Sequence, residues 1–555
     1  MRGGSRVAIM EWTLAASPKS RREAHYGNRV VSCFAERPAT VSDMFDATTA
    51  AKPDGEALVS GEQRWTWREV ESEVAACAAA LAERGIAAGD RVALLVGNRA
   101  EFVVALFAVL RLGAIAVPLS TRYQTPEIAF ALSDCGASLL IHDADLAPRL
   151  PAPDQVPGVR RRVVVGDAAS RHPDQAEPWR ALAPARAAPP PKRGLEEDTA
   201  IILYTSGTTG QPKGAMLTHL SLISSALVFQ YCFALTDADR SIAAAPLAHV
   251  TGIVANILSM LACSGTLIIL PEFKAPAFLA LAERERMTHT LLVPAMYNLC
   301  LLTPGFAERD LSTWRIGGFG GAPMPESTIT RLAENLPGLN LMNAYGATET
   351  TSPSTIMPAE FAASHLLSVG LPVPNCRIVI VNDHGIELPR GETGEIWISG
   401  PLVVKGYWNR PDADAESFTA GYWRSGDIGS MDEDGFVYVF DRKKDMINRG
   451  GFKIFSAEVE SVLASHPGVV ESAIIARPCP VLGERVHAFV TVREPVPSTL
   501  ELKRYVQDKL SDYKVPETFT LSIDPQPRNS NGKILKRLLR EALRLEADGN
   551  PQQRP

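Results

Sequence analysis

The stretch Tyr204-Thr-Ser-Gly-Thr-Thr-Gly-Gln-Pro-Lys-Gly214 places hydroxyls, glycines and one lysine directly after the apolar run Ala200–Leu203. A strand that runs into such a loop can present backbone N–H groups to a chain of phosphates. Glycine permits close approach, and Lys213 adds a positive point charge. Because Pro212 precedes the lysine and Gly214 stands where Ser or Thr belongs, the Walker pattern is not met. We expect a phosphate-binding loop of another kind, with a solvated turn as the alternative.

Length and composition describe an ordinary globular protein. The 555 residues are 46% hydrophobic and 21% charged, and this length predicts roughly three to four domains or lobes. The net charge of −6 gives no reason to expect nucleic-acid binding, which usually needs a basic surface.

Eight scattered cysteines contain no C-x-x-C pair, which favours reduced thiols and a cytoplasmic location. The uncharged span between Arg240 and Glu272 is long enough to cross a bilayer, but prolines, glycines and polar residues interrupt it. We therefore expect a strand, a turn, a helix over Ile253–Leu261 and another strand there, and no integral membrane segment.

Strand and helix patterns alternate along the first half of the chain. Arg91–Val96 is a short apolar run between glycine-containing turns, Ala100–Leu112 has helical character, and Ala114–Leu119 is again apolar. This alternation predicts an α/β fold with a mostly parallel sheet and helices on both faces. Residues 146–193 are rich in Pro, Ala and Arg, so we expect a surface excursion without chemistry of its own.

A second alternating region runs from Ala200 to about Met357, after which Arg377–Ile398 has the pattern of antiparallel strands. A charged stretch, Asp441–Asp445, precedes a smaller α+β pattern. We predict a boundary there, which divides the chain into an N-terminal extension (1–40), a large domain (41–440), a small C-terminal domain (441–545) and a tail (546–555).

Two further glycine-containing segments follow apolar strands. In Gly317-Gly-Phe-Gly-Gly-Ala-Pro323 the glycines would let a flat base lie against the backbone, although a tight strand-to-helix turn explains them equally. In Leu341-Met-Asn-Ala-Tyr-Gly-Ala-Thr-Glu-Thr350, Tyr345 could stack on a base, Thr348 could donate to a phosphate and Glu349 could hold Mg²⁺. The alternative is a strand end with incidental polar residues.

Two single residues become candidates for the same site because they accompany these motifs. Asp427, in Tyr422-Trp-Arg-Ser-Gly-Asp427, offers a carboxylate that suits paired ribose hydroxyls. Lys533 lies in a polar, glycine-containing loop and could reach into a cleft of another domain. The alternatives are that Asp427 only caps a loop and that Lys533 only contributes to solubility.

Together, in this order, these motifs resemble the adenylate-forming (ANL) superfamily of acyl- and aryl-CoA synthetases, adenylation domains and luciferases, over roughly Val41–Leu543. The resemblance implies a large N-terminal domain of two α/β subdomains plus a β-barrel-like subdomain, and a small mobile C-terminal domain. It implies that a carboxylic acid and ATP give an acyl-adenylate and pyrophosphate, after which a thiol displaces AMP. ATP, Mg²⁺ and CoA are the implied small molecules.

The resemblance also implies roles for individual residues of the large domain. Glu349 would hold magnesium and Thr348 would contact the α-phosphate. The phosphate loop would consist of Thr205, Ser206, Gly207, Thr208, Thr209, Gly210 and Lys213. The adenine site would consist of Gly321, Ala322, Pro323, Asn343, Ala344, Tyr345 and Gly346.

In the C-terminal part, Asp427 would hold the ribose with help from Arg442, and Lys444 would lie at the hinge. Lys533 would bridge the carboxylate and the α-phosphate in the first step. The loop containing Gly450 and Gly451 would line the thiol channel in the second step.

For the acid, the resemblance places His249 near the acyl carbon as a gate to the thiol tunnel; a structural core histidine is the alternative. Ile253–Leu261 lacks the Asp that an amino-acid activator usually carries, so we expect a fatty or aryl acid. Two departures from the family pattern are Ser456, where Pro is frequent, and Asp441, where Gly is frequent. A carrier-protein phosphopantetheine as acceptor, an ADP-forming ATPase and a nucleotide-binding non-enzyme remain as alternatives.

Overall fold

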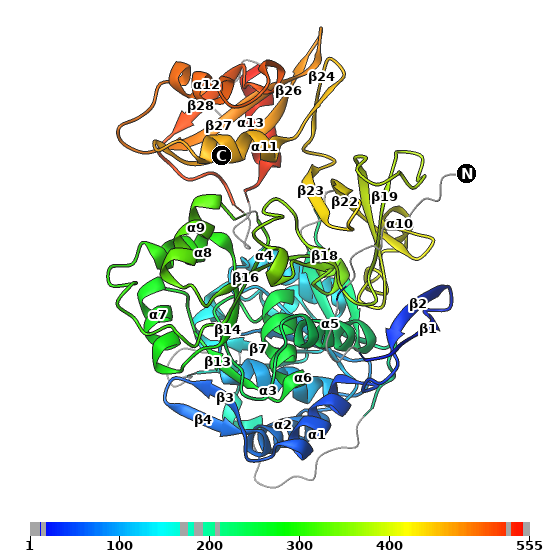
Figure 1. Ribbon diagram of the computed structural model, residues 1–555. Helices are drawn as coiled ribbons and strands as arrows, with labels where there is room; N and C mark the ends of the chain where they lie inside the picture. The colour runs from blue at the N-terminus through cyan, green and yellow to red at the C-terminus, as the bar shows by residue number, and fades with distance from the viewer. Residues whose placement is uncertain are drawn as a thin grey trace, which may run out of the picture. The chain divides into compact units, whose positions relative to one another are not determined.

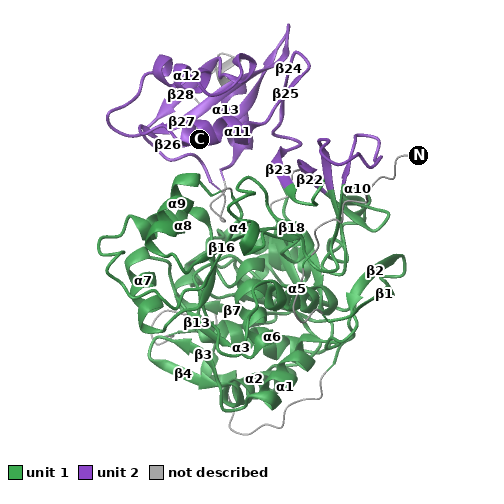
Figure 2. Cartoon of the chain, viewed as in Figure 1, with its two compact units in different colours: residues 1–379, 397–424, 432–437 green, residues 380–396, 425–431, 438–555 purple. Residues whose placement is uncertain are grey.

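The computed structural model describes residues 12, 18–166, 176–182, 193–205, 211–322, 324–528 and 534–547, without the side chains of 545–547. The chain forms two compact units (Figure 2). Unit 1 comprises Met1–Val379, Trp397–Arg424 and Asp432–Val437, and unit 2 comprises Ile380–Ile396, Ser425–Met431 and Tyr438–Pro555. The predicted domain limits at residues 41, 441 and 546 stay predictions.

One sheet of unit 1 has, among the residues described, seven strands in the order β11-β10-β6-β5-β7-β8-β9. All of the pairings are parallel except the antiparallel hairpin β10–β11. The strands are β5 (Arg91–Leu95), β6 (Ile115–Pro118), β7 (Leu139–Asp143), β8 (Arg161–Val165), β9 (Glu177–Pro178), β10 (Thr199–Thr205) and β11 (Lys213–Thr218).

Helices connect these strands as the alternation predicted (Figure 1). α2 (Trp67–Glu83) begins at a capping box in which Thr66 accepts from the Glu69 N–H group. α3 (Ala100–Arg111) is buried along nearly its whole length, because its sequence is apolar on every side. α4 (Thr125–Cys135) packs on the sheet through Ile128 and Leu132.

Residues 146–193 differ from the predicted surface excursion. Val163, Val164 and Val165 are fully buried in β8, which extends the sheet beside β7. The high Pro, Ala and Arg content of the surroundings concealed this short apolar run. Short 3₁₀ helices flank it: η1 (Ala144–Arg149), η2 (Pro153–Gln155) and η3 (Trp179–Leu182).

A second sheet of unit 1, as far as the chain is described, has the order β18-β17-β16-β15-β14-β12-β13-β3-β4. Its central strands are parallel. The strands are β3 (Glu56–Ser60), β4 (Gln63–Thr66), β12 (Arg240–Ala243), β13 (Thr266–Ile269), β14 (His289–Leu292), β15 (Ile316–Gly320), β16 (Asn340–Tyr345), β17 (Thr355–Ile356) and β18 (Leu371–Pro372).

Helical segments cover both faces of this second sheet. Ile242 of β12 belongs to a core with Phe278 of α7 (Ala275–Arg284) and residues of α8 (Pro294–Leu301) and α9 (Glu326–Asn335). Its neighbour Ser241 points to the opposite face, where its hydroxyl accepts from Asn256 at 3.0 Å. Asn256 belongs to the π-helix η4 (Thr251–Leu258), which continues into α6 (Ser259–Cys263).

The helix expected over Ile253–Leu261 is therefore present, as part of a buried α/β layer. Within the described residues, no helix combines the length and the apolar character that crossing a bilayer requires.

The predicted N-terminal extension contains an antiparallel hairpin, β1 (Ser20–His25) and β2 (Arg29–Phe34). This hairpin was not expected from the sequence. The hairpin precedes α1 (Val41–Ala51), and Val31 and Cys33 pack against Leu220 of α5 (His219–Cys232).

The expected β-rich region begins at Arg377. Its elements are β19 (Arg377–Val381), β20 (Gly394–Ser399), α10 (Pro411–Ser417), β21 (Phe418–Thr419), β22 (Tyr422–Met431) and β23 (Val437–Arg442). Two 3₁₀ helices precede this region, η5 (Thr348–Thr350) and η6 (Ala359–Phe361).

Unit 2 has its own α+β core around Ile474, Val490 and Val459. Its sheet, where described, has the order β25-β24-β27-β26 with β28 paired to β27. The elements are β24 (Ile447–Arg449), β25 (Phe452–Ile454), α11 (Ser456–Ala464), β26 (Val469–Cys479), β27 (Gly483–Val492), α12 (Thr499–Gln507), η7 (Asp512–Lys514), β28 (Thr518–Ser522) and α13 (Lys536–Ala547).

Candidate functional site

The carboxylate of Glu349 is a meeting point of three segments of unit 1. Its Oε1 atom accepts hydrogen bonds from the hydroxyl of Thr205, at the end of β10, at 3.3 Å and from Tyr407 at 3.0 Å. The backbone oxygen of Glu349 accepts from the Val404 N–H group at 2.9 Å. Thr205 and Glu349, predicted separately, are thus held together although 144 positions separate them.

The phenol of Tyr407 stays protonated in this arrangement. Burial, and then the neighbouring charge of Glu349, raise the pKa of Tyr407 far above its usual value. A protonated phenol can only donate to the carboxylate, so Tyr407 fixes the orientation of Glu349.

Lys213 lies close to the ring of the same tyrosine. It is the first residue of β11, and its Nζ atom is 5.0 Å from the centroid of the Tyr407 ring. This distance permits a cation–π interaction. Of the predicted phosphate loop, Ser206, Gly207, Thr208, Thr209 and Gly210 lie outside the described residues.

The predicted adenine-site residues come from two adjacent parallel strands. The ends of β15 and β16 pair in register, with Gly320 opposite Ala344 and Phe319 opposite Asn343. A Cβ atom at Gly320 would lie 2.3 Å from the Ala344 oxygen, so only glycine allows this close approach.

The remaining residues of this set continue from the same two strand ends. Gly321 and Ala322 follow β15, and Gly321 has a φ of +80° that favours glycine. Tyr345 ends β16 and Gly346 follows it. Thr348 begins η5, next to Glu349. Pro323 lies outside the described residues, and the adenine and phosphate roles stay predictions.

His249 lies in a loop whose course is set by Asn98. The Asn98 amide nitrogen donates to the backbone oxygens of Ala245 and Leu270, each at 3.0 Å, and its oxygen accepts from the Leu247 N–H group at 2.8 Å. His249 itself is half-buried, and its backbone oxygen accepts from Ile253 at the start of the helical segment. The gating role of His249 stays a prediction.

The other predicted residues lie in unit 2. Asp427 is buried, and its Oδ1 atom forms an ion pair with Arg442 Nε at 2.7 Å. Burial is the largest influence on Lys444 and lowers the pKa of its ammonium group. Gly450 and Gly451 form the turn between β24 and β25 with φ values of +59° and +91°. Their proposed roles stay predictions.

Lys533 lies outside the described residues. The described helix that follows it is α13, which begins at Lys536.

Sequence reasoning missed two residues of this site, Asn98 and Tyr407. Asn98 follows the buried strand β5 after Val96 and Gly97, and strand ends of parallel sheets are a common place for a functional polar side chain. Tyr407 follows the apolar run Leu402–Val404 in the same way. Neither signal identifies the partner, because both partners are distant in sequence.

Comparison with protein families gives two matches along the chain. Residues 45–408 match the family model described as AMP-binding enzyme, and residues 458–533 match the AMP-binding enzyme C-terminal domain. The first match alone spans more than half of the chain.

Characterised relatives align over nearly the full length. A long-chain-fatty-acid–CoA ligase of Mycobacterium tuberculosis is 35% identical over 89% of this chain and 96% of the relative. A feruloyl-CoA synthase of Amycolatopsis sp is 36% identical over 90% of this chain and 96% of the relative.

Among solved structures, the o-succinylbenzoate CoA synthetase of Bacillus subtilis in complex with its acyl-adenylate intermediate is similar. It has a TM-score of 0.81 and 31% sequence identity, and the alignment covers 91% of this chain and 98% of that one. The same synthetase has also been solved with ATP and a magnesium ion.

We predict that Asn98→Ala will loosen the loop that carries His249. The Leu247 N–H group would lose its acceptor, and the net value of one such hydrogen bond, about 1–1.5 kcal/mol, corresponds to roughly tenfold faster amide exchange. Hydrogen–deuterium exchange at Leu247 measures this change.

A matched control is Asn335→Ala, because Asn335 is exposed and its amide donates to the backbone oxygen of Arg331 in its own helix. Asn98→Asp should keep the acceptor for Leu247 but lose the bonds that the amide nitrogen donates. Unchanged exchange at Leu247 in Asn98→Ala would contradict the role of this carboxamide.

Proposed function

Because this chain belongs to the AMP-binding enzyme family, we propose that it is an ATP-dependent acid:CoA ligase. In the first step a carboxylate oxygen attacks the α-phosphorus of ATP, which forms an acyl-adenylate and releases pyrophosphate. In the second step the CoA thiol attacks the acyl carbon, which forms the thioester and releases AMP and a proton. The chain is thus an AMP-forming acid–thiol ligase.

The observation that carries this proposal is the cluster of Thr205, Lys213, Glu349 and Tyr407. It joins a hydroxyl, a cation and an oriented carboxylate at the end of β10, after which we propose the phosphate loop. The first reaction brings two anions together, so it needs fixed positive charge and donors more than a nucleophile. Carboxylic acids are ionised at neutral pH, so the first step needs no general base.

The residues present fit a magnesium ion. Both hydroxyl donors bind Oε1 of Glu349, and within the described part of the chain Oε2 receives no hydrogen bond. A fixed carboxylate oxygen of this kind is a ligand that Mg²⁺ prefers. When bound, the ion would neutralise phosphate charge, while Thr205 and Tyr407 hold the carboxylate in place.

For the acid we propose a fatty or aryl carboxylate. From Gly252 to Leu258 the helical segment after His249 is buried and apolar apart from Asn256, whose amide nitrogen is bonded to Ser241. The two relatives compared are named for a long-chain fatty acid and for an aryl acid, which supports both classes. A carrier-protein phosphopantetheine is the alternative acceptor.

We further propose a cytoplasmic location and the domain limits of the sequence analysis. All eight cysteines fall within the described residues and are free thiols, seven of them buried. Reduced, buried thiols are typical of proteins that fold in a reducing compartment.

Exchange of labelled pyrophosphate into ATP, measured with a panel of carboxylic acids of graded length and aromaticity, tests the proposal. We expect exchange that depends on the acid and AMP as the nucleotide product. Formation of ADP would indicate an ATPase. If none of the acids supported exchange, the chain would be a nucleotide-binding non-enzyme or would catalyse an unrelated reaction. Free CoA compared with carrier proteins then identifies the acceptor.

We predict that Tyr407→Phe will raise the magnesium concentration needed for half-maximal pyrophosphate exchange by about tenfold, because loss of a partner that orients a metal ligand has effects of this size. The change removes one hydroxyl and keeps the ring beneath Lys213. Tyr505→Phe, which removes a hydroxyl bonded to Ser465 in unit 2, is the control. An unchanged magnesium requirement would argue against Glu349 as the ligand.

The resemblance yields a separate prediction for Lys533→Ala. Pyrophosphate release should be abolished, because the attacking carboxylate loses its counter-charge, while thioester formation from a preformed acyl-adenylate should persist. Lys509→Ala, a lysine on another part of unit 2, should leave both steps unchanged. Equal loss of both steps in Lys533→Ala would contradict the role assigned to this lysine.

A further inference from the structure

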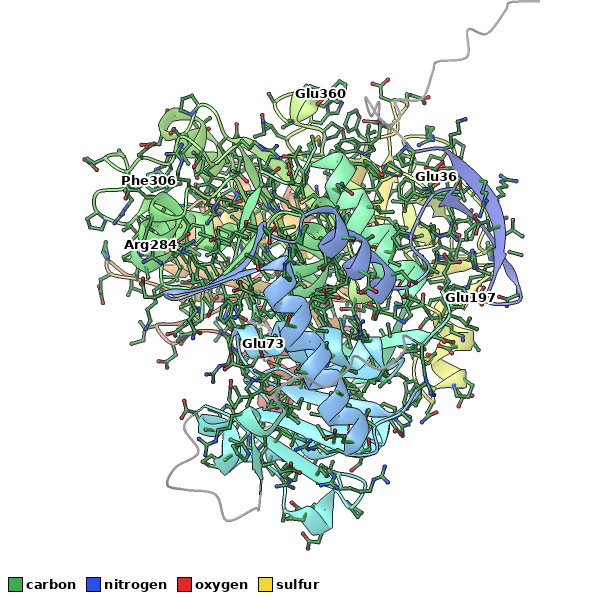
Figure 3. All side chains as sticks on the ribbon, turned by 90° about the horizontal axis from the view of Figure 1, so that it is seen from below. Glu36, Glu73, Glu197, Arg284, Phe306 and Glu360 are labelled. Carbon is green, nitrogen blue, oxygen red and sulfur yellow. The ribbon has the colours of Figure 1, made fainter. Side chains whose placement is uncertain are left out.

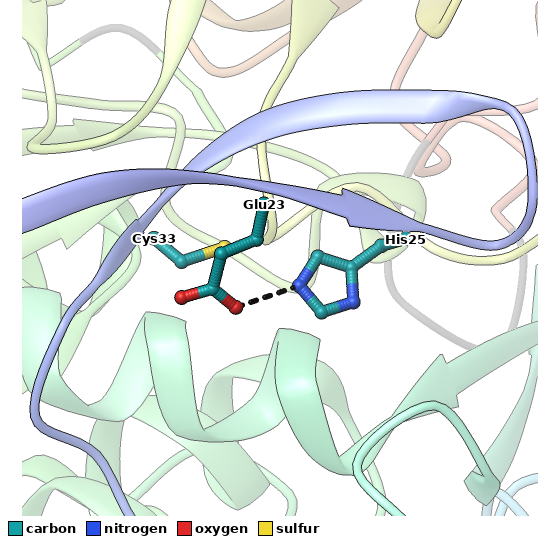
Figure 4. Close-up of side chains that lie close together, drawn as sticks. All are labelled: Glu23, His25 and Cys33. Carbon is teal, nitrogen blue, oxygen red and sulfur yellow. Dashed lines mark hydrogen bonds and ion pairs between the residues drawn. The ribbon is translucent and has the colours of Figure 1, made fainter.

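The N-terminal hairpin gathers three side chains that can bind a metal. Glu23 and His25 of β1 and Cys33 of β2 each offer one ligand atom, and these atoms all lie within 4.8 Å of one another (Figure 4). The hairpin precedes the family match, which begins at residue 45. None of the three residues belongs to the set proposed for the ATP site.

The spacing of Glu23 and His25 suits one tetrahedral ion. The Oε2 atom of Glu23 lies 3.2 Å from Nε2 of His25. Oxygen and nitrogen ligands at about 2.0–2.1 Å from zinc span a tetrahedral edge of ~3.3 Å. The Cys33 sulfur lies within 4.8 Å of these two atoms. A short movement toward the ion would make it the third ligand.

The second ring nitrogen of His25 is already oriented. Nδ1 lies 2.8 Å from Oε1 of Glu197, and Oε2 of Glu197 accepts from the Tyr26 N–H group at 3.1 Å. Figure 3 labels Glu197 on the side of the molecule where the hairpin lies. Metal-bound histidines usually donate their other N–H to such a carboxylate, which directs the free lone pair to the ion.

The arginines beside Glu23 leave one lone pair for a cation. Oε1 of Glu23 accepts from Arg21 and Arg37, whereas Oε2 accepts from Arg37 and faces His25. A carboxylate oxygen has two lone pairs, so the second lone pair of Oε2 is directed at the site. Arg37 thereby holds the carboxylate in place.

The local charge also favours a divalent cation. Glu23, Glu196 and Glu197 carry three negative charges, and Arg21 and Arg37 carry two positive charges. With Cys33 as a thiolate, the form in which cysteine binds metals, the sum is −2. His25 and Cys33 are buried at 5% and 0% exposure, so little water competes for the position.

We propose that Glu23, His25 and Cys33 form a zinc-type site that pins the N-terminal hairpin. A Cys/His/carboxylate set with one open position selects a borderline-soft ion over Mg²⁺, which prefers oxygen ligands alone. Cys33 packs against Leu220 of α5, so the ion would stabilise the packing of the hairpin against this helix.

The test uses the untagged full-length protein without ATP or magnesium. After equilibration with excess Zn²⁺ and gel filtration, elemental analysis should give one zinc per chain. Co²⁺ in its place should show the near-ultraviolet absorption of a cobalt–thiolate bond. Cys33→Ser should abolish this absorption, and Cys77→Ser, which alters another buried thiol in α2, should leave both results unchanged.

A second variant distinguishes a loss of zinc binding from a loss of folding. Glu197→Gln leaves all three ligands in place and should weaken zinc binding about tenfold, with the cobalt absorption retained. Absence of zinc from the wild-type protein would overturn the proposal. So would zinc binding that persists unchanged in Cys33→Ser, because the thiol would then not be a ligand of the ion.

Discussion

A single carboxamide joins the carboxyl ends of strands from two different sheets. Asn98 follows β5 of the seven-stranded sheet and binds the backbone beyond β12 and β13 of the nine-stranded sheet. Ligands of parallel α/β sheets bind at such carboxyl edges. The bonds of Asn98 therefore set the distance between the two edges and the course of the loop that carries His249.

The cluster at Glu349 depends on this scaffold. Thr205 comes from one sheet, Glu349 follows the other, and Tyr407 and Val404 come from a later loop. A reaction between two anions is accelerated by groups whose positions are fixed before the substrates arrive. Rigid strand ends meet this need better than mobile loops do.

Asp441 and Ser456, the two departures from the family pattern, are hydrogen-bonded to each other in unit 2. The buried carboxylate of Asp441 accepts from both the N–H group and the hydroxyl of Ser456, and Lys536 donates to the same hydroxyl at 2.7 Å. A proline at position 456 has no N–H group to donate. The serine thus supplies bonds that a buried carboxylate requires.

The sequence by itself determined the alternating α/β pattern and the glycine-rich end of β15, because each is a local pattern. It also identified Thr205 and Glu349 as candidates. The tertiary structure decided which of them meet, and it revealed Asn98, Tyr407, strand β8 and the hairpin cluster at His25. These depend on contacts between residues far apart in the chain, and no local pattern encodes which distant partner a polar side chain will find.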